Sequence, residues 1–355
     1  MTGPENAAIV PWLKDLPKVE LHVHLEGSLR PTTLFRLAER NGVDVGASTP
    51  DELNGLYQFN DFEDFAKLFF TGLAVLRSAE DFADATVSLA AELAAQNVPY
   101  AEVTSTPLTH QRRGVALEEY RDGLNEGRRR ARADYGVDLA WVCDIARETE
   151  DPESEATIGY LLDSTAPDGV VGLGLGGIEA GFPPELFASS FARAKASGLA
   201  SLPHAGETVG PESIWGALGS LNADRIGHGV HSLADPDLIA HLAAERIPLE
   251  VAPSSNVALK ISDSLEAHPL GELAAAGVVV TINTDDPAYF QTTLTDELLA
   301  AHRFHGFTRT KLVAAQLAAL NASYAATATK LRVRAELQRL LPGGAEDQRG
   351  QTTRT

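Results

Sequence analysis

The chain has 355 residues, 44% of them hydrophobic, and a formal net charge of −20 at pH 7. That length and apolar content suit one large α/β domain, and the acidic balance argues against nucleic acid or an anionic membrane as partner. A single cysteine, Cys143, excludes an internal disulfide framework and any zinc site built on a cysteine cluster.

The chain shows no apolar run long enough for a membrane-spanning helix, and its first residues, "MTGPENAAIV", lack the pattern of a secretory signal. We therefore expect a cytoplasmic protein that does not bind membranes. A small, weakly charged molecule is the substrate that suits this composition.

Short β-like runs alternate along the chain with Ala/Leu-rich segments of helical period. The eight runs are residues 18–24, 98–105, 137–145, 169–175, 199–205, 223–229, 247–253 and 277–284. This alternation predicts a (β/α)8 barrel, and the near-continuous apolar character of the runs is typical of strands covered on both sides.

Two segments depart from a simple strand–helix repeat. Residues 50–97 contain at least two helices between the first two predicted strands, an insertion that either roofs the active site or packs on the barrel. Further helices follow residue 306, and the chain ends in "PGGAEDQRGQTTRT". We predict one domain over residues 1–340 and a polar, disordered tail over 341–355.

Ionisable residues gather at the predicted ends of four strands, where (β/α)8 enzymes carry their catalytic groups. They are His22 and His24 after the first strand, His204 and Glu207 after the fifth, His228 after the sixth, and Asp285 and Asp286 after the eighth. Residues two apart in a strand face the same side, so both histidines of "HVH" point into the barrel mouth.

Each motif alone has an ordinary structural interpretation. An isolated H-x-H pair is as compatible with core histidines as with a metal site, His204 alone is more often structural, and "TDDP" is typical of a capped turn. Burying so many ionisable groups together is costly without a partner, and Zn²⁺ is a common solution. Histidines and an aspartate without cysteine fit a hydrolytic metal, which lowers the pKa of its water.

The segments "ELHVHLEGSLRP", "PHAGE", "RIGHG", "LEVAPSSN" and "TINTDDP" together resemble the adenosine deaminase family of the amidohydrolase superfamily, in the family's order over about residues 16–300. The resemblance implies a distorted (β/α)8 barrel with one zinc ion per chain. It also implies hydrolytic deamination, in which oxygen replaces the 6-amino group of a purine and ammonia is released.

The resemblance also implies roles for individual residues. The zinc ligands would be His22, His24, His204 and Asp285. Glu207 would protonate purine N1, His228 would stabilise the attacking hydroxide, and Asp285 would help to take the water's proton. Asp286 would contact N7, the backbone of Gly177 would bind N3, and Glu26 would lie toward the ribose 5′ position. His24 would bind the substrate as well as the zinc ion.

The substrate implied is a 6-aminopurine nucleoside, with adenosine itself as the default. Many adenosine deaminases have aspartate where this chain has Glu26, which puts the 5′ group in doubt, and Ala252 stands where cysteine is usual. The strand-four motif "GLGGIE" is similar to bacterial relatives that include deaminases of 6-aminodeoxyfutalosine, an adenine nucleoside with a bulky 5′ group that belongs to menaquinone biosynthesis. Free adenine is the further alternative, although its deaminases usually have a serine in this motif.

Two other classes of function are weaker alternatives. A two-metal amidohydrolase usually bridges its ions with a lysine or glutamate at the end of strand four, where this chain has Gly176 and Gly177. A catalytically dead binding protein would be expected to lose a ligand or the acid, and none is lost here. The expected pocket wall comprises Phe62, Phe65, Leu68, Ser105 and Thr106.

Overall fold

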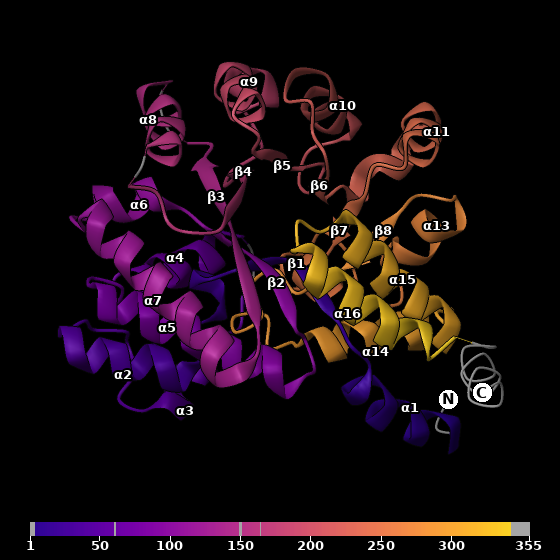
Figure 1. The fold of residues 1–355 in the computed structure, drawn as a ribbon, viewed down its shortest axis with the longest axis horizontal. Helices are drawn as coiled ribbons and strands as arrows, with labels where there is room; N and C mark the ends of the chain where they lie inside the picture. Colours follow the sequence, from indigo (N-terminus) through magenta and orange to yellow (C-terminus); the bar gives the residue numbers. More distant parts are fainter. Residues whose placement is uncertain (1–3, 60–61, 149–150, 164, 342–355) are drawn as a thin grey trace, which may run out of the picture.

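The computed structural model describes residues 4–59, 62–148, 151–163 and 165–341, and its centre is an eight-stranded parallel sheet rolled into a barrel (Figure 1). The strands are β1 (Val19–His24), β2 (Tyr100–Ser105), β3 (Asp138–Ala146), β4 (Val170–Gly176), β5 (Ala200–Ala205), β6 (Ile226–His228), β7 (Leu249–Val251) and β8 (Val280–Ile282). They pair in chain order, so the predicted (β/α)8 barrel is confirmed.

Strands β6 to β8 are shorter than the sequence predicts, with three residues each. Strand β6 ends at His228, which still pairs with Ala205 of β5 but has a left-handed backbone with φ 61°. Asp285, three residues after the end of β8, has φ 64°. Both residues belong to the predicted site.

The barrel is closed by the segment that follows β8. The backbone N–H of His24 donates to the carbonyl of Asp285 at 2.9 Å, and the N–H of Asp285 donates to the carbonyl of His22 at 2.9 Å. A parallel bridge pairs Val23 with Asp285. Two predicted metal-site segments therefore form the seam between the first and last strands.

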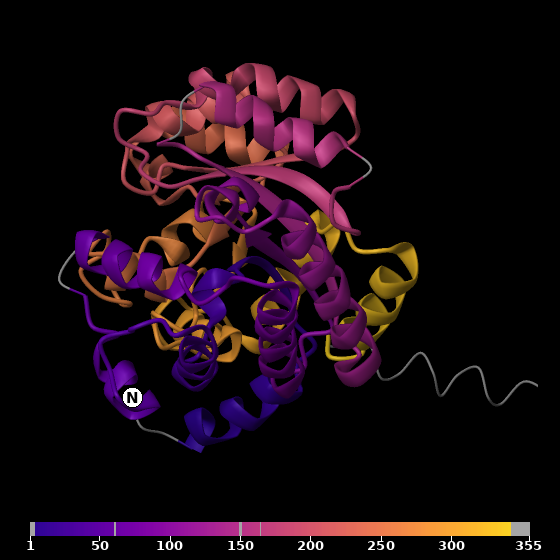
Figure 2. The ribbon, with the colours of Figure 1, turned by 90° about the vertical axis from the view of Figure 1, so that its left-hand side faces the viewer.

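Helices cover the outside of the barrel and extend it at both ends of the chain. They are α1 (Pro4–Asp15), α2 (Pro31–Asn41), α3 (Pro50–Gly55), α4 (Phe62–Leu73), α5 (Ala79–Ala95), α6 (Pro107–Arg112), α7 (Leu117–Tyr135), α8 (Asp151–Leu162), α9 (Ala188–Ala196), α10 (Pro211–Ser220), α11 (Pro236–Glu245), α12 (Pro253–Ala258), α13 (Leu270–Ala275), α14 (Leu294–Phe304), α15 (Arg309–Ala322) and α16 (Thr327–Gln338). Short 3-10 helices are η1 (Glu26–Ser28), η2 (Pro184–Phe187) and η3 (Val230–Ala234). In a view turned by 90°, α8 to α11 cover one side of the barrel and the helices of residues 31–135 cover another (Figure 2).

The predicted insertion between the first two strands is present as α3, α4 and α5. Helix α5 starts at a capping box, in which the Ser78 side chain accepts from Asp81 N–H and the Asp81 carboxylate accepts from Ser78 N–H. It packs on the outside against α7, whereas α4 lies over the barrel mouth and lines the cavity described below. The additional C-terminal helices, α14 to α16, are also present.

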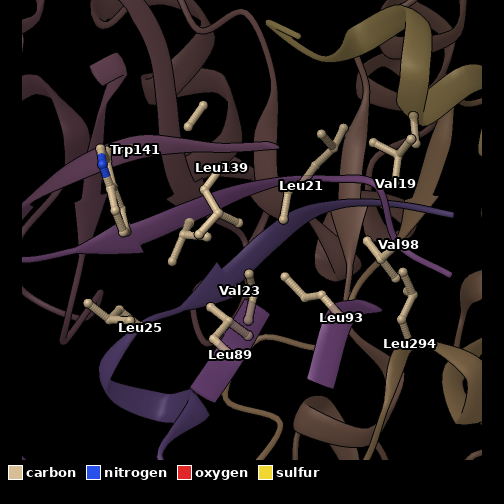
Figure 3. Close-up of a cluster of buried hydrophobic side chains, with 14 of the residues drawn as sticks. Val19, Leu21, Val23, Leu25, Leu89, Leu93, Val98, Leu139, Trp141 and Leu294 are labelled. Carbon is tan, nitrogen blue, oxygen red and sulfur yellow. The ribbon is translucent and has the colours of Figure 1, made fainter. Parts of the chain in front are cut away.

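Strand β1 shows why its histidines face inward. Val19, Leu21 and Val23 are buried on its outer face, and Val23 lies beside Leu89 and Leu93 of α5 (Figure 3). Because side chains alternate along a strand, the histidines of "HVH" point to the opposite face, into the barrel. A one-residue slip would exchange these faces and bury imidazoles in the apolar layer, so the register is strongly specified.

Among the described helices, none combines the length and apolar character needed to cross a bilayer. The division into one domain and a tail stays a prediction, because all of the predicted tail after Leu341 lies outside the described residues.

Candidate active site

The ionisable residues predicted at the strand ends meet at one end of the barrel. The imidazole centroid of His22 lies 4.5 Å from that of His204 and 4.8 Å from that of His228. The centroids of His24 and His204 are 5.3 Å apart. Asp285 follows β8 and approaches His22, with its Oδ1 3.5 Å from the ring Nε2. The barrel therefore brings residues from the first and the last strand segments into one cluster.

A cavity of about 490 Å³ opens above this cluster. Its polar inner end is lined by His24, Glu26, Asp144, Gly176, Gly177, His204, Glu207, His228, Asp285 and Asp286. The remaining predicted site residue, His22, lies directly beneath these groups and is 2% exposed. The volume is typical of a site for a small organic molecule.

The outer part of the cavity is largely apolar. Phe65, Phe69, Phe70 and Leu73 of α4 form one wall, and Ile178 and Leu259 contribute from other segments. The cavity is also lined by the polar and charged residues Thr106, Thr109, Arg112, Arg113 and Glu148. Of the expected wall residues, Phe65 and Thr106 line the cavity, whereas Ser105 and Leu68 are not among its lining residues. The side chain of Phe62 lies outside the described part of the structure.

Several buried imidazole nitrogens at the inner end lack a hydrogen-bond partner among the described residues. They are His22 Nε2, His24 Nε2 and His204 Nδ1. Leaving buried polar atoms unpaired is costly, and native structures rarely do so without a reason. Imidazole nitrogen and carboxylate oxygen are ligands that a divalent metal ion such as zinc accepts, so the chemistry of the residues present fits such an ion.

Three groups of possible metal ligands have their ligand atoms within 4.8 Å of one another among the described residues. They are His22, His204, His228 and Asp285; His24, Asp144 and His204; and His24, Asp285 and Asp286. The predicted ligand set of His22, His24, His204 and Asp285 overlaps every group and coincides with none. Distances alone therefore do not choose between His24 and His228 as the third imidazole.

Asp144 is a buried member of the site that the strand-end pattern of the sequence did not reveal. It lies on β3, and burial is the main cause that raises its pKa to about 7. The neighbouring strand leaves room for its carboxylate, since a Cβ at Gly174 would lie 1.8 Å from Asp144 Oδ1 and one at Gly176 would lie 2.5 Å from Oδ2. Two features of the sequence could have indicated Asp144. Alternation along β3 directs its side chain into the barrel, and the alternating glycines of "GLGLGG" on β4 leave space beside it.

A buried network beneath the cluster orients His22. Its Nδ1 lies 3.0 Å from Glu250 Oε2 on β7. Glu250 also accepts a hydrogen bond from Arg225, which donates to Glu102 on β2, and each of these side chains is at most 5% exposed. A carboxylate that holds one imidazole nitrogen leaves the other nitrogen available to a metal.

A second carboxylate, Glu179, holds the loop that carries Glu207. It accepts from the backbone N–H groups of residues 206–209, at 3.1 Å for Glu207 and 2.8 Å for Thr208, and also from the Ser213 hydroxyl. Gly177 lies two residues before Glu179. Its φ of +90° and its close approach to the Glu148 carboxylate suit only glycine. Glu179 therefore ties the end of β4 to the loop after β5.

Burial and neighbouring charge separate the protonation states of the site carboxyls. Burial, with Asp285 and Glu179 nearby, raises the pKa of Glu207 to about 8, which favours its protonated form. Burial opposes ionisation of Asp285 as well, but His22 and His24 hold its pKa well below the usual range. Such divergence between neighbouring acids is typical of an active site.

Glu26 is also buried, and it is held by its own partners. Its Oε1 accepts from Ser105 Oγ at 2.6 Å and lies 2.8 Å from His110 Nε2. Burial alone would raise its pKa, but the contact with His110 lowers the pKa below its ordinary value. Glu26 lines the cavity while these bonds direct one of its oxygens toward α6.

Comparison with known proteins bears directly on this site. The profile of the adenosine deaminase family matches residues 17–340. The chain belongs to the adenosine deaminase family. It is therefore a hydrolase that acts on C–N bonds, as the sequence predicts.

Relatives within the family carry two different activities. The chain is 42% identical over 327 residues to the aminodeoxyfutalosine deaminase of Streptomyces avermitilis, covering 92% of this chain and 91% of the relative. It is 39% identical over 326 residues to the adenine deaminase of Rhodospirillum rubrum, covering 92% and 97%.

Solved structures show the same architecture. The adenine deaminase of Arthrobacter aurescens has a TM-score of 0.87 at 35% identity, covering 91% of this chain and 98% of that one. An amidohydrolase from Burkholderia ambifaria, solved with bound zinc, has a TM-score of 0.84 at 26% identity, covering 94% of each chain.

Proposed function

We propose that this chain is a zinc-dependent deaminase of a 6-aminopurine nucleoside, adenosine or a 5′-substituted adenosine. Water adds its oxygen to C6, the C6–N bond breaks, and the products are the inosine-type nucleoside and ammonia. The observation that carries this proposal is the position of the buried Glu207, whose pKa is raised, beside a cluster of imidazole nitrogens without hydrogen-bond partners among the described residues, in one cavity. An acid and a nucleophile site are thereby placed within reach of the same small molecule.

The chain's own residues supply proton transfer and substrate orientation. Glu207 donates its proton to purine N1, which makes C6 more electrophilic. His228, whose Nε2 lies 3.7 Å from Glu207 Oε1, stabilises the incoming oxygen. Asp286 meets N7, and the backbone of Gly177 meets N3, so that both edges of the ring are held.

The ligands in this proposal are His22, His24, His204 and Asp285, with one zinc ion per chain. When bound, zinc lowers the pKa of its water and supplies a nucleophile at neutral pH. Ser255 donates to Asp285 Oδ2 at 2.6 Å and so leaves Oδ1, which faces both histidines of β1, for this role.

The outer part of the cavity supports a 5′-substituted nucleoside over the bare base. A purine held at the polar inner end would leave the wall of Phe65, Phe69 and Phe70 without a ligand group against it. An apolar 5′ substituent would cover that wall and bury its surface. The sequence similarity to an aminodeoxyfutalosine deaminase supports the same preference.

Free adenine is the second candidate substrate. Its support is the similarity, at 35–39% identity, to adenine deaminases of Rhodospirillum rubrum and Arthrobacter aurescens. Glu26 adds a structural argument, because the hydrogen bonds to Ser105 and His110 already occupy an oxygen that would otherwise meet a ribose hydroxyl.

A substrate panel tests the proposal. Adenine, adenosine and 5′-deoxy-5′-methylthioadenosine would each be incubated with the zinc-loaded protein, and the loss of adenine absorbance and the release of ammonia would be followed. We expect the highest kcat/KM on the 5′-substituted nucleoside. A higher value on adenine would support the second candidate, and no turnover of any 6-aminopurine would exclude both.

A further inference from the structure

A chain of buried hydrogen bonds leads away from His228 on the side opposite the cavity. His228 Nδ1 lies 3.3 Å from Asn256 Nδ2, and Asn256 Oδ1 lies 3.1 Å from His268 Nε2. The backbone N–H of Leu270 then donates to His268 Nδ1 at 3.1 Å. His228, Asn256 and His268 are at most 3% exposed, so water does not compete for these positions.

The backbone N–H of Leu270, at the end of this series of hydrogen bonds, determines which atom donates in each of the others. A backbone N–H can only donate, so His268 Nδ1 accepts and carries no proton. Burial lowers the pKa of His268 to about 3, so the ring is neutral and its proton resides on Nε2. That Nε2–H donates to the carbonyl oxygen of Asn256, and the Asn256 amide group must then donate to His228 Nδ1.

We infer that Asn256 and His268 are positioning residues that fix His228 as the tautomer protonated at Nε2. Nδ1 of His228 is occupied as an acceptor, so its single proton resides on the nitrogen that faces Glu207 and the cavity. His228 therefore meets the reacting atoms as a hydrogen-bond donor. The tautomer itself does not depend on the proposed function, whereas its use in stabilising the incoming oxygen rests on it.

The tautomer of His228 also decides which of the possible metal-ligand groups can bind an ion. A metal ion needs a nitrogen lone pair, and the Nε2–H of His228 offers none toward the cluster. His24 Nε2, in contrast, is buried and has no hydrogen-bond partner among the described residues. His24 rather than His228 is therefore the third imidazole available to a metal.

Nitrogen NMR of the imidazole rings tests the inference without using activity. In uniformly ¹⁵N-labelled protein, the His228 signals would be assigned by their loss in His228→Gln. We expect a protonated Nε2 and an unprotonated Nδ1 in the parent. We also expect His228→Gln to retain one equivalent of zinc, whereas His24→Gln loses it. A parent His228 protonated at Nδ1, or loss of zinc from His228→Gln, would overturn the inference.

Asn256→Asp provides the functional arm. Its carboxylate accepts from both neighbours, so His228 must place a proton on Nδ1, and we expect kcat to fall about 10²-fold or more. Asn321→Asp makes the same chemical change at an exposed asparagine that binds Arg334, and it should match the parent. An Asn256→Asp variant with parental kcat and an unchanged His228 tautomer would contradict the inference. A parent with the expected tautomer but no deaminase activity would instead exclude the proposed function.

Discussion

Replacing Glu250 with glutamine tests whether the buried network orients His22 as a metal ligand. Glu250 lies 3.0 Å from His22 Nδ1 through Oε2 and accepts from Arg225 through Oε1. Glutamine keeps the shape but has only one accepting atom. If that oxygen stays with Arg225, the amide N–H₂ faces His22 Nδ1, and the imidazole proton must move to Nε2, where it blocks the metal.

The expected magnitudes follow from this geometry. Losing the partner of a metal-bound imidazole typically lowers metal affinity about 10–100-fold, which corresponds to about 1.4–2.7 kcal/mol. Arg225, 1% exposed, keeps its charge but also keeps its second buried partner, Glu102, so the loss of stability should be smaller than the about 3–5 kcal/mol of breaking an isolated buried ion pair. We expect weaker zinc binding in competition with a chromophoric chelator and a lower free energy of unfolding in urea.

The matched control is Glu155→Gln, which changes a carboxylate that is 41% exposed and paired with Arg193 on the surface. It should alter neither quantity appreciably. A Glu250→Gln variant with parental zinc affinity would refute the reasoning that this carboxylate sets the tautomer of His22, even if its stability falls.

Four further outcomes are expected. Glu207→Gln should lower kcat at least about 10²-fold with unchanged zinc content by elemental analysis, and a variant as fast as the parent would show that Glu207 is not the acid. The protonated form of Glu207 is the acid and its pKa is raised to about 8, so kcat/KM should fall as the pH rises toward and through this value. A bound cation favours the carboxylate and moves the fall to lower pH. A kcat/KM that does not fall anywhere between acidic pH and the pKa of about 8 would contradict the assignment of Glu207 as the acid. Glu179→Gln should lower kcat by up to about 10²-fold and speed amide hydrogen exchange over residues 206–209. Unchanged exchange would mean that Glu179 is not needed to order this loop. Phe70→Ala, at a side chain 56% exposed, should raise KM for 5′-methylthioadenosine and leave KM for adenine unchanged in steady-state assays, and an equal effect on both would remove the wall from the specificity argument.

The amino-acid sequence was sufficient to predict the barrel and the gathering of the site, for a physical reason. Strand alternation fixes which face of β1 carries His22 and His24, and parallel topology brings the ends of all strands to one rim. A residue at the end of a strand is therefore placed at this rim by the topology alone. This explains why His204 and Asp285 could be placed together although 81 residues separate them.

Residues that act through a partner were not predictable in the same way. Glu250, Arg225 and Glu102 each lie inside a predicted strand, and only the folded barrel shows that their charges meet. Asn256 and His268 stand outside the predicted strand ends, and their significance depends on the direction of hydrogen bonds. Periodicity indicates which face a side chain occupies, whereas pairing across the barrel depends on how distant strands are arranged in space.

The seam between β1 and the segment after β8 has a consequence for how the site comes into existence. The ligands proposed here begin at His22 and end at Asp285, and the backbones of these two residues are hydrogen-bonded to each other. During synthesis, the first histidines emerge from the ribosome long before their aspartate partner exists. Binding of a metal by the full proposed ligand set must therefore wait until the last strand has been made.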